Sequence, residues 1–132
     1  MNVDVVALLE EGLRSVGRES LLSPGLEAHS TIALDFADCP SIMIDQIDGD
    51  VWLSASLDIT EERWAAMALP ILECVSEQSE FIASRAPSVF KRAGAVDLYA
   101  LIGEAFLCDA PVFLQALEGF QERVRRLGDI IQ

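Results

Sequence analysis

Apolar residues recur every three or four positions at the start of the chain. In the segment VDVVALLEEGLRSVG they form one stripe, with the charged residues elsewhere on the helical wheel, and the stripe consists of Val5, Val6, Leu9, Leu13 and Val16. Such a stripe is typical of an amphipathic helix. Because glycine commonly follows the last helical turn, the pattern predicts a first helix that ends near Gly17.

The period changes to two after a loop that contains Ser23, Pro24 and Gly25. Apolar and polar residues alternate in HSTIALDF, in SIMIDQI and in DVWLSASLD. Alternation of this kind predicts strands with one buried face. Asp48-Gly49-Asp50 is a signal for a tight hairpin turn, since glycine tolerates the positive φ that such turns require. Three consecutive antiparallel strands are therefore expected after the first helix.

The next segment, from Thr60, predicts a second helix with an unusually wide apolar arc. Glu61 and Glu62 fall in its first turn, near the positive end of the helix dipole. The arc covers more than half of the circumference, whereas a helix that only covers a sheet needs a stripe of roughly 100°. We expect this helix to pack against its own sheet and against something else. Pro70 lies inside it and predicts a kink or an early end.

The remaining pattern predicts two strands and a helix. Ser88 to Arg92 fits a short edge strand, and AVDLYALIG at 95–103 is a clearer one. A last helix opens at Asp109, and its apolar stripe runs over 113–131. The order of helix, three strands, helix, two strands and helix predicts an α+β fold with the helices on one face of an antiparallel sheet. Residues 1–132 are expected to form a single domain.

The third strand places a tryptophan on its polar side. Trp52 alternates with the apolar residues Val51 and Leu53, so it should point away from the core. One interpretation is that Trp52 contacts a partner, with Met43 and Ala33 on the same outer face. The other is that the chain's own loop covers it through Leu21, Leu22 and Leu26. A single exposed aromatic side chain does not decide between the two.

The chain is strongly acidic and yet rich in apolar residues. Lys and Arg number 9 against 22 Asp and Glu, which gives a net charge of -13, while 52% of the residues are hydrophobic. This charge argues against nucleic-acid and membrane partners, and the apolar content argues against disorder. No apolar run approaches the roughly 18 residues of a membrane span. The absence of a signal-peptide pattern and three widely spaced cysteines predict a cytoplasmic protein.

Residues that carry chemistry are sparse. The only histidine, His29, and either Cys39 or Cys108 are the candidates for a thiol enzyme, but no oxyanion signature accompanies them. The spacing of the cysteines fits no metal motif, and the glycines form no phosphate-binding loop. The sequence therefore predicts a protein that is not an enzyme and has no metal or other cofactor. The thiol enzyme is the catalytic alternative.

A resemblance to a known family is carried by the segments HSTIALDF, PSIMI and GDVWLSASL, with DVVALLEEGLRSVG before them and FLQALEGFQERVRRLGDII near the end. These segments resemble the type III secretion chaperones of the invasion protein B (SpaK) family. The resemblance spans the chain and implies a small cytoplasmic homodimer without enzymatic activity. Such proteins bind the extended N-terminal segments of effector proteins and hold them competent for export. A dimeric adaptor that binds a folded partner is the alternative.

Two surfaces are expected from the patterns and the resemblance together. A groove for the effector segment is expected at Ala33, Met43, Trp52, Ile42 and Ile47. The wide apolar arc of the second helix suits the dimer interface, with candidate residues Trp64, Met67, Ala68, Ile71 and Val75. The secretion ATPase is a further candidate partner.

Overall fold

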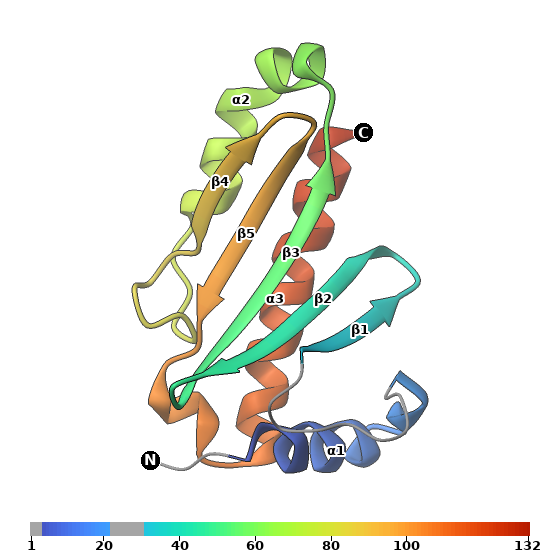
Figure 1. The fold of residues 1–132 in the computed structure, drawn as a ribbon, viewed down its shortest axis with the longest axis vertical. Helices are drawn as coiled ribbons and strands as arrows, with labels where there is room; N and C mark the ends of the chain where they lie inside the picture. Colours follow the sequence, from blue (N-terminus) through green and yellow to red (C-terminus); the bar gives the residue numbers. More distant parts are fainter. Residues whose placement is uncertain (1–3, 22–30) are drawn as a thin grey trace.

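An antiparallel sheet forms one layer of the molecule and helices form the other (Figure 1). The computed structural model describes residues 4–21 and 31–132. The elements in chain order are α1 (Val5–Ser15), the short 3-10 helix η1 (Glu19–Leu21), β1 (Ile32–Phe36), β2 (Cys39–Ile47), β3 (Asp50–Asp58), α2 (Glu61–Ser76), β4 (Ser88–Arg92), β5 (Ala95–Leu101), a second 3-10 helix η2 (Glu104–Leu107) and α3 (Ala110–Ile131). The predicted α+β class and element order are confirmed.

The five strands follow the order β1-β2-β3-β5-β4, so β1 and β4 are the edge strands. Asp48 and Gly49 connect β2 to β3 with φ values of 51° and 86°. A two-residue turn with both residues at positive φ matches the twist of the strands that it joins. The resulting register sets Asp45 opposite Trp52, and Trp52 opposite Leu101 on β5. Trp52 therefore lies on the central strand of the sheet, near the β2–β3 turn.

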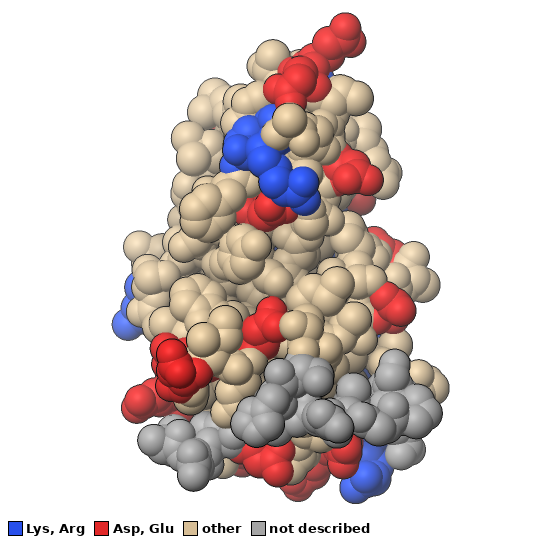
Figure 2. Space-filling view, viewed as in Figure 1, with Lys and Arg blue, Asp and Glu red and all other residues tan. Residues whose placement is uncertain are grey.

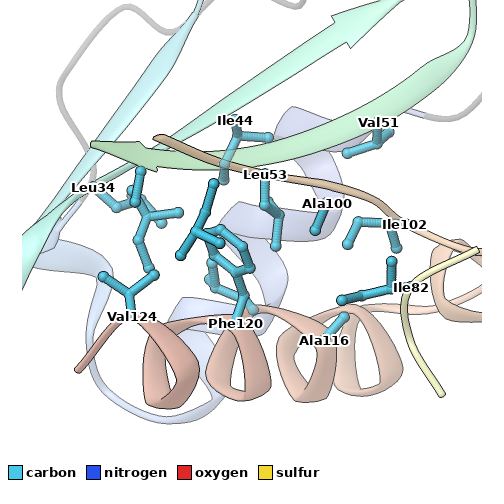
Figure 3. Packing of buried hydrophobic residues seen from close by; sticks show 14 of the residues in the cluster. Leu34, Ile44, Val51, Leu53, Ile82, Ala100, Ile102, Ala116, Phe120 and Val124 are labelled. Atoms are coloured by element: carbon cyan, nitrogen blue, oxygen red, sulfur yellow. The ribbon is translucent and has the colours of Figure 1, made fainter. Parts of the chain in front are cut away.

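The core lies between the sheet and α3 (Figure 3). Leu53 and Ile44 of the sheet and Phe120 of α3 point into this layer, and each is at most 1% exposed. The α3 stripe is buried because its apolar residues recur on one side of the helix. Asp109 caps the start of the helix by accepting a hydrogen bond from the backbone N–H of Val112 at 3.0 Å.

Two arginines connect α2 and α3 through hydrogen bonds. Near the start of α2, Arg63 donates hydrogen bonds to the carbonyl oxygens of Ile130, Ile131 and Gln132 at 3.1, 2.8 and 2.6 Å. On α3, the buried Arg123 donates to Ser79 Oγ at 2.6 Å, just beyond the end of α2. The Arg63 bonds satisfy carbonyl groups that the end of α3 leaves without partners. The two arginines hold α2 in place from both of its ends.

Pro70 does not end α2 early, contrary to one of the two outcomes that the sequence predicts. The helix continues to Ser76. Proline removes one backbone donor from the helix interior. The residues that follow Pro70 pack into the core, and this packing stabilises the last turns of the helix; they are Ile71, Cys74 and Val75.

Candidate functional site: two exposed apolar surfaces

No described helix packs on the outer face of the sheet (Figure 1). Seen from this side, the molecule has a broad uncharged area across its middle, bordered by acidic groups, with basic groups near the upper end (Figure 2). Several large apolar side chains remain exposed there, and they are Met43, Ile47, Phe90 and Tyr99. We call this the outer face. Water contact on so much apolar surface is unfavourable, which marks the face as a candidate contact surface.

The strand register brings three aromatic residues together on the outer face. Phe90 and Tyr99 meet edge to face, with ring centroids 5.6 Å apart and an interplanar angle of 79°. Trp52, on the neighbouring strand β3, lines the same cavity of about 320 Å³. The other lining residues of this aromatic pocket are Asp45, Ile47 and Ser88. A second cavity of about 310 Å³ adjoins it and includes Met43 and Tyr99 in its lining.

The charged groups of the outer face differ in their partners. Arg92 Nε donates to Asp97 Oδ2 at 2.7 Å, and Ser56 Oγ donates to Asp97 Oδ1 at 2.6 Å. The hydrogen bonds from Arg92 and Ser56 hold the pKa of Asp97 below its usual range. Asp45 accepts a hydrogen bond from the Thr31 hydroxyl. Asp97 is therefore paired with a cation, whereas Asp45 is paired with a neutral hydroxyl.

The outer face contains most of the residues predicted for the groove. Ala33, Met43 and Ile47 are exposed, and Trp52 is half-buried. Ile42 was assigned wrongly: it is 0% exposed, because alternation along β2 turns it toward the core while Met43 turns outward. The alternative cover for Trp52 involves Leu21, Leu22 and Leu26. Leu21 is half-buried and packs against the core, while Leu22 and Leu26 lie outside the described residues, as does His29.

The second surface is the solvent side of α2. Of the predicted interface residues, Trp64, Met67 and Ala68 are half-buried, and Trp64 and Met67 pack against the core. Two predicted interface residues were assigned wrongly: Ile71 and Val75 are 1% and 4% exposed and belong to the core.

The most exposed large apolar residues of α2 are Leu69 and Leu72, at 65% and 58%. They belong to the wide apolar arc, which indicated a second contact but not which half of the arc would face outward. We call the ridge formed by Ala65, Leu69 and Leu72 the helix ridge.

Sequence reasoning missed Phe90 and Tyr99. The alternation in AVDLYALIG sets Tyr99 on the same side as Asp97, opposite the apolar positions, and that signal was sufficient to place it outward. Phe90 lies in the weakest part of the pattern, and only the pairing of β4 with β5 brings it beside Tyr99. The aromatic pocket thus depends on long-range strand pairing.

Two of the three thiols, Cys39 and Cys74, have raised pKa values, whereas Cys108 is exposed. Burial and the nearby Asp38 raise the pKa of Cys39, which holds that thiol in its protonated, less reactive form. Cys74 is buried, and burial raises the pKa of its thiol as well. The described part of the chain contains no cluster of three metal-ligating side chains. None of its helices is both long and apolar enough to cross a membrane.

Comparison with known proteins gives sequence relatives over most of the chain. The Invasion protein B family matches residues 17–93. The surface presentation of antigens protein SpaK of Salmonella typhimurium is 32% identical over 124 residues, which cover 90% of this chain and 89% of that protein. SpaK of Salmonella typhi matches to the same extent.

Solved structures share the fold at low sequence identity. A chain of the HopA1-SchA chaperone-effector complex matches with a TM-score of 0.62 and 14% identity over 95% of this chain and 93% of that one. A chain of the ExoU-SpcU complex from the type III secretion system of Pseudomonas aeruginosa has a TM-score of 0.54 and 18% identity over 94% and 98%. YbjN of E. coli, a proposed transcription regulator, has a TM-score of 0.62 and 14% identity over 98% and 93%.

Proposed function

The chain belongs to the invasion protein B family of type III secretion chaperones, and we propose that it acts as a cytoplasmic homodimer that binds the N-terminal segments of effector proteins. It keeps these segments soluble and extended and directs them to the secretion apparatus, with the secretion ATPase as a candidate docking partner. The observation that carries the proposal is the outer face, where apolar side chains stay exposed over a folded sheet.

The outer face suits an extended segment for two reasons. It contains two adjoining cavities, which can receive side chains that project from a strand-like peptide. The face also ends at the edge strands β1 and β4, whose backbone groups can pair with an added strand. Burial of an aromatic residue such as Trp52 removes about 150–250 Å² from water, which favours binding. The bound segment then covers surface that would otherwise promote aggregation.

The helix ridge is the proposed contact between two copies of the chain. Leu69 lies near the middle of α2, so a two-fold axis near it sets each ridge against the same ridge of the partner. The acidic ends of the helix are partly neutralised, since Glu61 pairs with Lys91 at 2.8 Å and Glu77 with Arg126 at 2.8 Å. Trp64, Met67 and Ala68 extend the apolar contact along the helix.

Binding of recombinant N-terminal effector segments tests the proposal. We expect Trp52→Ala to weaken the affinity by at least about tenfold, because a central aromatic anchor contributes about 2 kcal/mol or more to an interface. Circular dichroism and the molar mass of the dimer should not change. Val16→Ala is the matched control, since Val16 is 48% exposed but lies at the end of α1. Equal affinities of the wild type and Trp52→Ala would exclude the outer face as the binding site.

Hydrogen exchange separates this function from that of an adaptor for a folded partner. An effector segment should exchange rapidly when free and become protected only on the chaperone. A partner that is equally protected when free would identify the adaptor instead.

A further inference from the structure

The described lining of the aromatic pocket combines three aromatic rings with one carboxylate. Trp52, Phe90 and Tyr99 contribute the rings, and Asp45 is the only charged residue among the described residues of the lining. A cation placed over an aromatic ring gains about 0.5–2 kcal/mol, and a carboxylate strengthens the attraction through a charge-assisted hydrogen bond. An aliphatic anchor gains nothing from the carboxylate and removes water from it at a cost. The lining therefore fits a cationic side chain better than an aliphatic one.

The partners of the two nearby carboxylates support this assignment. Asp97 already holds Arg92 at 2.7 Å, so its charge is balanced within the chain. Asp45 accepts a hydrogen bond from Thr31, and none of the ion pairs among the described residues involves it. A partner that covers the outer face must bury Asp45 together with the apolar residues around it. Burial of a carboxylate without a counter-ion is costly, and a partner that brings its own cation avoids that cost.

We propose that the aromatic pocket binds an arginine side chain of the extended effector segment. This inference rests on the proposed function and names the side chain that the outer face selects. A guanidinium group is planar, stacks on aromatic rings and donates two parallel hydrogen bonds to one carboxylate. Its aliphatic stem packs along apolar surface such as Ile47, which is 57% exposed. The net charge of -13 also attracts cationic segments to the chaperone.

Short extended peptides of defined sequence test the assignment. The probe is an acetylated and amidated heptapeptide, Ser-Val-Thr-X-Thr-Val-Ser, with arginine, norleucine or glutamate at X. Affinities are measured by NMR titration that follows the indole N–H of Trp52. We expect the arginine peptide to bind about tenfold more tightly than the norleucine peptide, and the glutamate peptide to bind most weakly.

A pair of charge-neutralising variants separates the pocket from the overall charge. Asp45→Asn should abolish the preference for arginine over norleucine. Asp48→Asn makes the same charge change in the β2–β3 turn, outside the pocket, and should keep the preference. Its φ of 51° is a conformation that asparagine adopts readily.

Three results would overturn the inference. They are norleucine binding as tightly as arginine, an equal loss of preference in both variants, and no binding of the arginine peptide at millimolar concentration. Each of these leaves the proposed function standing if full N-terminal effector segments still bind the wild type and lose affinity for Trp52→Ala. Failure of those segments to bind at all counts against the proposed function itself.

Discussion

The double substitution Leu69→Asp with Leu72→Asp tests how two copies of the chain associate. The two leucines are 65% and 58% exposed, so the single chain gains little from them. Complete burial of a leucine side chain contributes about 1.5–3 kcal/mol. Scaled by the exposed fractions and counted over both copies, burial of the helix ridge corresponds to about 4–7 kcal/mol. Aspartate removes this contribution and adds four like charges at the two-fold contact.

We expect the dissociation constant of the dimer to rise by at least about 10³ in this variant. Sedimentation velocity over a range of micromolar concentrations measures the change, and circular dichroism confirms that the single chain still folds. Phe90→Asp is the control, because Phe90 is 58% exposed on the outer face. A dimer that persists in the double variant and dissociates in Phe90→Asp would refute the reasoning, since the outer face would then be the self-contact.

Two further predictions concern the stability of the fold. A Cβ at Gly119 would lie 2.6 Å from the ring of Phe81. Gly119→Ala should therefore lower the free energy of unfolding, measured by urea denaturation, by about 1–3 kcal/mol. Gly128→Ala is the control and should not lower it, because a Cβ at Gly128 would have its nearest contact at 3.9 Å. Arg92 holds the pKa of Asp97 below its usual range, so the stability from this pair is complete above about pH 4 and is lost as the pH falls through the folded-state pKa. Asp97→Asn should therefore flatten the acid limb of the stability curve, and an unchanged acid limb would mean that the pair does not stabilise the folded chain.

The elements with one buried side were predictable from local pattern. The α3 stripe and the alternation in β3 each specify a buried face without knowledge of any neighbour. The hairpin turn followed from Gly49, because few other residues adopt its backbone conformation. Trp52 was placed outward for the same local reason.

The predictions that were wrong or missing concern residues whose exposure depends on which neighbouring elements cover them. The sequence predicted which side of α2 is apolar. Only packing against α3 and the sheet decides that Ile71 is buried while Leu72 stays exposed. Proximity to Met43 in sequence suggested that Ile42 shares its surface, although adjacent residues of a strand face opposite sides. The aromatic pocket needs the pairing of β4 with β5, which lies beyond any local pattern.

A map of the surface that an effector segment covers tests the account most directly. An NMR comparison of the free chaperone with its complex with an N-terminal effector segment reports on each methyl and indole group. The account predicts that the largest changes fall on Met43, Ile47 and Trp52 of the outer face, and that the segment gains protection from hydrogen exchange only when bound. Changes confined to other surfaces, with Trp52 unaffected, would contradict it.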